Sequence, residues 1–228
     1  MKLSKIILKK MNPSIADEIP LSYYCRIRGG NIVARLRGII RKVGIKKVGA
    51  KLKLERSVIL RVKKQIILGS NVRIGKAVEV NALSLKGVHI GNNSSITAYS
   101  TVKVSWSLSD LGLGIWIGEN SSFGEYTFFG GAGGIHLGND VISGQYVRFH
   151  SENHNFKDSS RLIRQQGVTR KGITIGNDVW IGAGSVFLDG SEVGNHCVVA
   201  ANSVVTSIFP DGVIIGGCPA KVIKKIKK

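Results

Sequence analysis

The stretch ITIGNDVWIGAGSVFLDG, residues 173–190, contains the clearest copy of the repeat on which the fold is built. A large apolar residue returns at every sixth position without a slip: Ile175, Ile181, Phe187, Val193, Val199 and Val205. Glycine often follows this residue, and a small residue, mostly serine, stands four positions after it. A period of six is typical neither of an amphipathic helix nor of a meander of hairpins. It indicates a short strand and a tight turn, repeated many times.

Three such units close one triangular coil of about 18 residues, with the large side chain inside and the small one at the crowded corner. Gly, Asn or Asp accepts the turn geometry. The same phase is present earlier, in segments that start at Leu68, Ile90, Ile117 and Leu137. Successive coils pair in parallel at about 4.8 Å, so about six coils would make a column roughly 29 Å tall. The sequence therefore predicts an all-β fold, a parallel β-helix whose ends need covers.

Breaks in the phase divide the chain. There is a slip near residues 86–87, an insert at 105–114 and a longer polar insert at 151–172. A polar loop of that length within a regular solenoid is usually functional or disordered. The predicted organisation is a basic N-terminal arm at 1–65, a β-helix domain at 66–209 with the inserted loop 151–172, and a basic C-terminal tail at 210–228.

The excess positive charge lies at the two ends of the chain. Of the 228 residues, 33 are Lys or Arg and 14 are Asp or Glu. Residues 1–64 contain 18 basic and 3 acidic side chains, whereas 65–220 contain 10 basic and 11 acidic ones. Nucleic-acid binding would favour basic residues interleaved with aromatic ones, and the arm has only Tyr23 and Tyr24. We therefore expect no nucleic-acid partner.

Within the arm, residues 31–43 place apolar side chains at helical spacing with basic ones between them, and Asn31 is a candidate N-cap. One interpretation is a helix that caps the open end of the column. The other is a basic amphipathic helix that attaches to an anionic membrane surface, where each Lys or Arg contributes roughly 1 kcal/mol. Both interpretations stay open, and Gly38 weakens the helix.

The composition also bears on where the protein works. No run approaches the roughly 18–20 apolar residues that a membrane-spanning helix needs. The first ten residues hold a three-residue apolar stretch and do not form a secretory signal. The three cysteines, Cys25, Cys197 and Cys218, are odd in number and far apart, so they do not form a disulfide framework. We expect a soluble, cytoplasmic protein of a reducing compartment.

The six-residue pattern, with ITIGNDVWIGAGSVFLDG and the tail GGCPAKVIKKI at 216–226, resembles the hexapeptide-repeat acyltransferases. Those proteins are left-handed parallel β-helices that move acetyl or acyl groups from coenzyme A or acyl carrier protein. The segment from His154 to Ala183 is most similar to the sugar and polysaccharide O-acetyltransferases, with the galactoside and maltose enzymes as close relatives. The resemblance implies acetyl-CoA as co-substrate and a homotrimer with active sites between adjacent columns.

The resemblance also implies a catalytic histidine. Ungapped counting from Leu137 brings that position to His154, as the general base that takes the proton of an acceptor hydroxyl. Glu152, or a backbone carbonyl, would fix the tautomer of its ring. His150 follows the inward Phe149, so its strand phase points it outward, and we expect it to have a structural or acceptor-binding role.

A zinc site is the alternative interpretation of His150 and His154, because zinc-dependent carbonic anhydrases share this fold. Further histidines complete the site in those enzymes, whereas His89, His136 and His196 lie at unrelated phases here. We therefore expect no metal.

The same ungapped comparison, started at Trp180, implies a set of positions for coenzyme A: Trp180, Ala183, Ala201, Thr206, Ser207, Lys221 and Lys224. Ala183 and Ala201 stand one coil apart, and small side chains there would let backbone groups reach the pantetheine amides. The two lysines suit the phosphates, and their alternative is a solvated basic tail. Ser207 replaces the basic residue often found there, so one phosphate contact is in doubt.

The resemblance is weakest for the residues that would bind the acceptor. The sugar-binding residues of the galactoside enzymes have no clear match, although Glu125 and Tyr126 are candidates for a sugar hydroxyl. The predicted function is acetyl transfer from acetyl-CoA to a hydroxyl of a saccharide, as in a surface polysaccharide or its lipid-linked precursor at the inner face of a membrane. N-acetylation of an amino sugar and a non-catalytic scaffold at a membrane surface are the alternatives.

Overall fold

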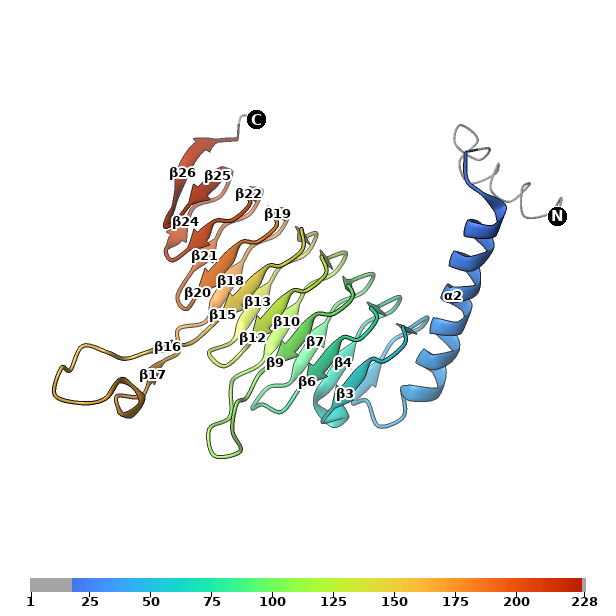
Figure 1. Ribbon diagram of the computed structural model, residues 1–228, viewed down its shortest axis with the longest axis horizontal. Coiled ribbons are helices and arrows are strands. Elements are labelled where there is room, and N and C mark those ends of the chain that lie inside the picture. The colour runs from blue at the N-terminus through green and yellow to red at the C-terminus, as the bar shows by residue number, and fades with distance from the viewer. Residues whose placement is uncertain (1–17, 227–228) are drawn as a thin grey trace.

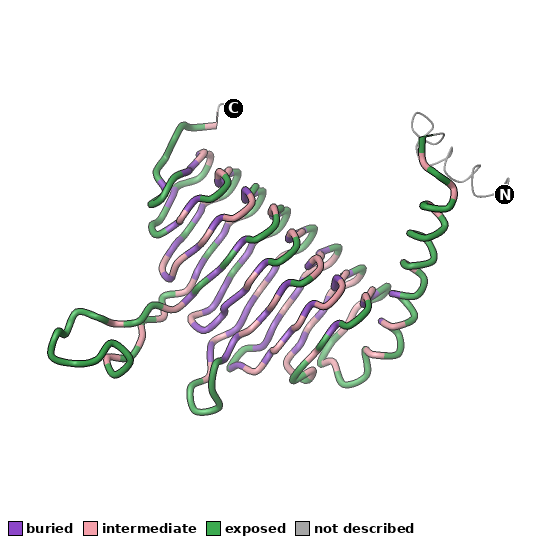
Figure 2. The backbone as a smooth tube through the Cα atoms, in the orientation of Figure 1, coloured by how far each residue is buried: buried purple, intermediate pink, exposed green. Residues whose placement is uncertain are grey.

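The computed structural model describes residues 18–226 and shows a three-walled column of short parallel strands with a helix at its N-terminal end (Figure 1). The start of the predicted arm, residues 1–17, and the last two residues of the predicted tail lie outside the described residues. Buried residues follow the walls of the column, and the loops and the helix are mostly exposed (Figure 2). The predicted parallel β-helix is confirmed.

Each wall of the column is one sheet. The first sheet consists of β1 (Lys47–Val48), β4 (Ile66–Leu68), β7 (Val88–Ile90), β10 (Ile115–Ile117), β13 (Ile135–Leu137), β18 (Ile173–Ile175), β21 (Glu192–Val193) and β24 (Ile208–Phe209). The second consists of β2 (Lys53–Leu54), β5 (Arg73–Ile74), β8 (Ser95–Ile96), β11 (Ser122–Phe123), β14 (Ile142–Ser143), β19 (Val179–Ile181), β22 (Cys197–Val199), β25 (Val213–Gly217) and β26 (Ala220–Lys225). The third consists of β3 (Ile59–Arg61), β6 (Glu79–Asn81), β9 (Thr101–Lys103), β12 (Phe128–Gly130), β15 (Arg148–His150), β20 (Val186–Leu188) and β23 (Val204–Val205).

The column is longer than the sequence predicted. It begins with β1 and not near residue 66, because Lys47 and Val48 pair in parallel with β4. In this first coil, lysines face outward beside buried residues such as Leu54. The alternation makes the six-residue repeat hard to see within a basic segment. At the other end, β25 adds a strand beyond residue 209. Within residues 18–226 the three sheets therefore form seven complete coils and part of an eighth, where about six were predicted.

The length of a coil is also less regular than predicted. The step of 18 residues holds between β19 and β22, where Trp180 pairs with Val198. Elsewhere it is longer, as in the pairing of Ile117 with Leu137. Connections from the first to the second sheet, and from the second to the third, are uniformly short. The additional residues lie between the third and first sheets, at a corner that we call the variable corner: 82–87, 104–114, 131–134 and 151–172.

The two predicted inserts are confirmed, and both project from the variable corner (Figure 1). The insert at 104–114 has no helix or strand of its own. The longer one, residues 151–172, is the segment that we call the arm from here on, and it is distinct from the basic N-terminal arm. It contains the antiparallel pair β16 (Asn153–His154) and β17 (Val168–Thr169) and a short 3-10 helix at Ile163–Gln165. A second 3-10 helix, at Lys63–Gln65, turns the corner of the first coil.

The interior of the column is apolar and contains stacked aromatic rings. The predicted inward residues Ile175, Phe187 and Val193 are all buried. Phe149 stacks against Phe129 at 5.3 Å and against Phe187 at 4.9 Å between ring centroids, so one phenyl column crosses three coils. Since interiors of this kind are close-packed, each ring fills space that no neighbour can take over.

The predicted helix is present but begins ten residues earlier. The helix α2 runs over Leu21–Arg41 with Pro20 as N-cap, so the prediction that Asn31 caps it was wrong. The side chain of Asn31 instead accepts a hydrogen bond from Nη1 of Arg73 at 3.0 Å, which ties α2 to the column. Gly38 is needed for close packing, because a Cβ there would lie 2.2 Å from the carbonyl oxygen of Leu52.

We predict that Phe149→Ala lowers the free energy of unfolding by about 3–5 kcal/mol, because it opens a cavity between two stacked rings. Urea denaturation followed by circular dichroism measures the change. Leu108→Ala, at a residue of the insert that is 85% exposed, is the control and should leave stability unchanged. Equal effects of the two substitutions would contradict the proposed packing.

Candidate active site

His154 lies on β16, at the base of the arm and outside the variable corner. The pairing of His154 with Val168 on β17 fixes its backbone. The side chain is exposed, and its ring makes no hydrogen bond with any other residue in the described range 18–226. Both ring nitrogens are therefore open to a ligand in this structure.

Both ends of the arm are fastened to the column. At its start, Oγ of Ser151 donates to the carbonyl oxygen of Gly130 at 2.7 Å and accepts from the backbone N–H of Gly133 at 2.9 Å. At its end, Oδ1 of Asp189 accepts two backbone N–H groups, those of Lys171 and Gly172, each at 2.8 Å. The histidine therefore projects from a loop with two rigid ends.

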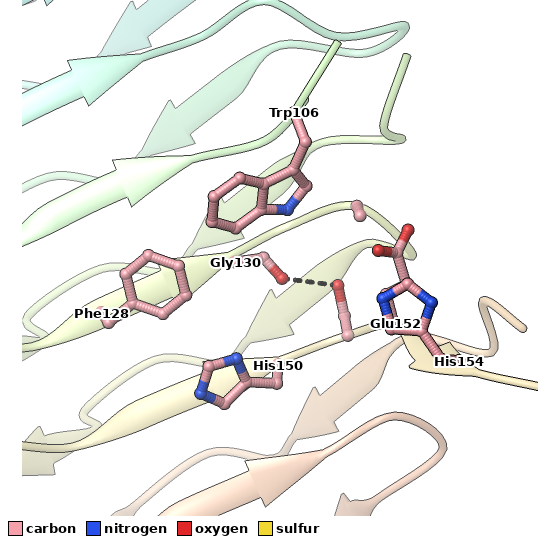
Figure 3. Close-up of a pocket in the computed structure, with 8 residues that line it drawn as sticks. Trp106, Phe128, Gly130, His150, Glu152 and His154 are labelled. Atoms are coloured by element: carbon pink, nitrogen blue, oxygen red, sulfur yellow. Dashed lines mark hydrogen bonds between the residues drawn. The ribbon is translucent and has the colours of Figure 1, made fainter. Parts of the chain in front are cut away.

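On one side of His154 is a hollow of about 380 Å³ that we call the aromatic hollow, lined among others by Trp106, Phe128, Gly130, His150, Glu152 and His154 (Figure 3). The Phe128 ring lies 5.3 Å from the ring of His150 and 6.3 Å from that of Trp106. Gly130 makes room for this ring, because a Cβ there would lie 2.8 Å from Cε1 of Phe128.

On the other side is a hollow of about 520 Å³ that we call the polar hollow. It lies along the arm, and its lining includes His154, Asn155, Gln166, Thr169, Lys171 and Asp189. Of the residues that line the two hollows, His154 is the only one that borders both. One residue thus borders both a region rich in aromatic rings and a region rich in amides and charges.

An arginine joins the two inserts. Arg170, in the arm, lies 2.6 Å from the carboxylate of Glu152, and its guanidinium donates to both oxygens of Asp110 in the other insert, at 2.7 and 2.6 Å. The hydrogen bond from Arg170 lowers the pKa of Asp110 from its ordinary value of 3.8. Glu152, which the sequence offered as an orienting partner for His154, is thus bound by a cation instead.

His150 points outward from β15, as its strand phase predicted. Partial removal from water lowers the pKa of its imidazole below the ordinary value of 6.5, and the charge of Arg148 lowers it further. The ring packs against Phe128 as a face of the aromatic hollow. It lies in the same hollow as His154.

Glu125 and Tyr126 lie elsewhere. They occupy the corner between the second and third sheets, at the opposite edge of the third sheet from the variable corner. Tyr126 stacks between Tyr99 at 5.1 Å and Tyr146 at 4.9 Å, and all three tyrosines adopt a positive φ of about 60°. Such a backbone is rare for a bulky residue, and stacking helps to hold it. Neither residue lines the two hollows.

The residues proposed for coenzyme A fall into separate groups. Ala183 and Ala201 lie one above the other at the corner between the second and third sheets, where Ala183 accepts the backbone N–H of Asn202 at 2.8 Å. Trp180 lies on the outer face of the second sheet with 57% of the residue exposed. Lys221 and Lys224 are in β26 of that sheet. Thr206 and Ser207 turn the variable corner after β23.

Three residues of the site were missed in the sequence. Trp106 lies in the insert that was recognised only as a break in phase, and Phe128 was seen only as part of an apolar run. Asp189 follows a strand in the position of a turn residue, so it carried no signal of its burial. All three can be recognised as lining residues only when the stacking of the coils is known.

Among residues 18–226, no three His, Cys, Asp or Glu side chains are grouped so that they could hold a metal ion. None of the helices in that same range is both long enough and apolar enough to span a bilayer.

Comparisons with known proteins agree with the repeat. The family described as bacterial transferase hexapeptide (six repeats) matches residues 172–207, and the hexapeptide repeat of succinyl-transferase matches 65–98. Over 147 residues the chain is 31% identical to WbbJ of Escherichia coli, a putative lipopolysaccharide biosynthesis O-acetyl transferase, with 60% of this chain and 75% of that protein covered. It is 29% identical over 160 residues to a probable acetyltransferase of Mycobacterium tuberculosis, with 70% and 51% covered.

Among solved structures, a single-residue variant of AntD is similar in fold. AntD is an N-acyltransferase from Bacillus cereus, and this structure contains dTDP and coenzyme A. It has a TM-score of 0.56 and 19% sequence identity, with 84% of this chain and 90% of that chain covered. The fold is thus the left-handed parallel β-helix, as the resemblance implied. The chain belongs to the hexapeptide-repeat acyltransferase family. It spans about half the length of the mycobacterial relative and three quarters of WbbJ.

We predict that Arg170→Gln loosens the two inserts without unfolding the column, because Asp110 and Glu152 lose their shared cation. Hydrogen–deuterium exchange should become faster in residues 104–114 and 151–172 and stay unchanged in the strands. Since the pKa of Asp110 is lowered from 3.8, its contact with Arg170 should be complete above that pH and be lost as the pH falls below it. Arg164→Gln, an exposed arginine of the arm, is the control, and equal exchange in the two variants would contradict the bridge.

Proposed function

We propose that this protein transfers an acetyl group from acetyl-CoA to a hydroxyl of a saccharide, with His154 as the general base. The observation that carries the proposal is the position of His154 between two hollows of different chemistry. A transferase must bring two substrates to one base, and a single imidazole that borders two hollows suits that requirement.

The proposed chemistry needs one proton carrier. The unprotonated ring nitrogen of His154 takes the hydroxyl proton as the acceptor oxygen forms its bond to the carbonyl carbon of the thioester. The carbon–sulfur bond then breaks, and the imidazolium returns the proton to the sulfur of coenzyme A. A sugar hydroxyl is a poor nucleophile, and general-base catalysis by a well-placed group contributes roughly 10²–10⁴ in rate.

The donor half of the proposal rests on the second sheet, on its corner with the third sheet and on the variable corner. The small side chains of Ala183 and Ala201 leave backbone groups accessible to a pantetheine chain, and Lys221 and Lys224 are exposed cations suited to phosphates. Thr206 and Ser207 lie at the same corner as the arm. Trp180, with its exposed indole, is proposed to border the acetyl group.

We propose a homotrimer because these groups are spread around the column. The arm leaves the variable corner, whereas Ala183 and Trp180 lie at the other corner of the third sheet and on the second sheet. A neighbouring copy of the chain can bring the arm of one column to the second sheet of another. The exposed apolar residues of that sheet, which include Ile142, Trp180 and Ile223, are suited to such a contact.

The acceptor class is proposed from the relatives. WbbJ is named for lipopolysaccharide biosynthesis and O-acetyl transfer, which supports a surface polysaccharide or its lipid-linked precursor as acceptor. AntD is an N-acyltransferase, so N-acetylation of an amino sugar remains the second candidate. Analysis of the product by mass spectrometry and NMR separates an ester from an amide.

We further propose that α2 holds the protein at the cytoplasmic, inner face of a membrane. Its buried residues, Ala34 and Gly38, face the column, and the opposite side exposes an aliphatic stripe: Ile32, Leu36, Ile39, Ile40 and Val43. Residues 21–43 contain six Lys or Arg and no Asp or Glu. An exposed apolar stripe flanked only by cations suits an anionic lipid surface.

We predict that His154→Ala lowers the rate of thiol release from acetyl-CoA, measured with a panel of saccharides, about 10²- to 10⁴-fold. The dissociation constant of coenzyme A, measured by calorimetry, should stay unchanged. His196→Ala is the control, because that exposed ring lies at another corner, 2.6 Å from Asp178. An undiminished rate in His154→Ala removes this residue from its role. A wild-type protein that binds no coenzyme A would favour the non-catalytic scaffold.

We predict that the protein sediments with vesicles of anionic phospholipid and that high salt releases it. Arg35→Gln with Lys42→Gln should weaken the binding by about 2 kcal/mol, since each cation near the lipid contributes about 1 kcal/mol. Lys64→Gln with Lys86→Gln removes the same charge from exposed sites on the column and is the control. If both double variants bind equally, α2 is not the membrane contact.

A further inference from the structure

Three side chains with flat rings line one side of the aromatic hollow. Trp106 comes from the insert at 104–114, Phe128 from β12 and His150 from β15, so the rings belong to three successive coils. Figure 3 shows these rings around one space, with Glu152 and His154 on the other side of it. Trp106 is 59% exposed, although tryptophan is highly buried on average. A large apolar side chain therefore remains uncovered beside the proposed base.

Contacts at the base of the insert hold Trp106 in place. The neighbouring Ser105 is buried, and its Oγ donates to the carbonyl oxygen of Leu83 and accepts the backbone N–H of Gly112 at 2.9 Å. The ammonium group of Lys103 lies 3.8 Å from the centroid of the indole. Lys103 does not line the hollow, so this cation–π contact holds the indole without filling the space.

The carboxylate of Glu152 has one oxygen that is bound and one that is open. Its Oε2 accepts from Nε of Arg170 at 2.7 Å and lies 2.6 Å from Nη2 of the same guanidinium. Its Oε1 has no hydrogen-bond partner among residues 18–226 and, unlike the buried Oδ2 of Asp189, is not closed off from solvent. A carboxylate oxygen only accepts hydrogen bonds, so a ligand in the hollow would have to bring an O–H or N–H group to it.

The charge of the lining restricts the ligand further. Of the described residues that line the aromatic hollow, one is acidic and none is Lys or Arg, in a chain with 33 Lys or Arg and 14 Asp or Glu. A phosphate or a carboxylate placed there would meet the charge of Glu152 without a lining cation to balance it. None of the seven residues proposed for coenzyme A lines this hollow. The hollow therefore suits an uncharged part of the acceptor better than the donor.

We propose that the aromatic hollow binds an uncharged sugar ring of the acceptor, with the C–H face of the sugar on the indole of Trp106 and a hydroxyl donating to Oε1 of Glu152. A pyranose has an apolar face of C–H groups and a polar rim of hydroxyls, which matches rings on one side of the hollow and a carboxylate and an imidazole on the other. This inference rests on the proposed acetyltransferase function and names the acceptor subsite of the same site. It selects against sugars that carry a negative charge.

Trp106→Ala tests the stacking surface. The KM of the best uncharged acceptor in the saccharide panel should rise about 3- to 10-fold, the range expected for losing one ring contact. The dissociation constant of coenzyme A and the midpoint of thermal unfolding should not change. Leu108→Ala is the matched control, because Leu108 is an exposed apolar residue of the same insert that does not line the hollow. An equal rise in KM in both variants would indicate a general effect of the insert and would overturn the assignment to Trp106.

Matched pairs of sugars test the role of Glu152. Methyl glucoside, methyl galactoside and methyl mannoside are each compared with the methyl glycoside of the corresponding uronic acid, which differs by a carboxylate at one carbon. In saturation-transfer NMR the wild type should contact an uncharged sugar more strongly than its acidic counterpart. Glu152→Gln keeps an oxygen for Arg170 and removes the negative charge, so it should bring the two signals closer together. Equal signals from the two sugars in the wild type would overturn the inference.

The same NMR measurement separates this inference from the proposed function, because it does not depend on turnover. The signals of the uncharged sugars should be lost in Trp106→Ala and kept in Leu108→Ala. The inference fails if the wild type gives no signal with any uncharged sugar, if Trp106→Ala keeps the full signal, or if Trp106→Ala binds coenzyme A more weakly. Sugar contact without any acetyl transfer contradicts the proposed function alone, whereas acetyl transfer with an unchanged KM in Trp106→Ala contradicts this inference alone.

Discussion

The rest of the structure depends on the parallel hydrogen-bond ladder that joins each coil to the next. At the corner between the first and second sheets, side chains extend this ladder. Oδ1 of Asn139 accepts the backbone N–H of Glu119, and Oδ1 of Asn177 accepts that of Asn139, each at 2.8 Å. Asn195 and Asp211 continue the series at 2.8 and 2.7 Å. An insertion at this corner would break contacts in the coils above and below it.

The variable corner has no such series of asparagine side chains among the described residues, so a coil can lengthen there without disturbing its neighbours. Both long inserts leave the column at that corner and meet through Arg170. The aromatic hollow forms where the two inserts meet the outer face of the third sheet, and the polar hollow lies along the arm beside Asp189. The position of the candidate site is therefore a consequence of which corner tolerates extra residues.

Most of the column could be predicted from the sequence, because its signal is local and repeats. Phe187 and Val193 are inward wherever the six-residue phase holds, and the inserts are visible as interruptions of that phase. The first coil escaped because its outward lysines, such as Lys53, make it look like part of a charged tail. The start of α2 was missed because two consecutive glycines, Gly29 and Gly30, usually weaken a helix. In the structure both lie inside α2, and a side chain at either position would meet nothing within 4 Å.

Of the candidate site, the sequence could indicate only the residue that a single motif identifies. His154 was found by counting along a motif, but Trp106, Phe128 and Asp189 are distant in sequence and meet only through the register of stacked coils. The pairing of Arg170 with Asp110 depends on the shapes of two irregular loops, for which no periodic signal exists. Glu125 and Tyr126 lie at the opposite edge of the third sheet from the arm and line neither hollow, so their contact with a sugar hydroxyl stays a prediction.

The two proposals about the membrane and the acceptor constrain each other. The helix α2 lies beside the first coil, and His154 leaves the column after β15, four strand steps from β3 along the third sheet. At about 4.8 Å a step, His154 stands about 19 Å along the column from that end. If the N-terminal end rests on the lipid, a sugar attached directly to a headgroup cannot reach His154, whereas an oligosaccharide extended from a lipid carrier can. Attachment through α2 thus favours an acceptor of several sugar units.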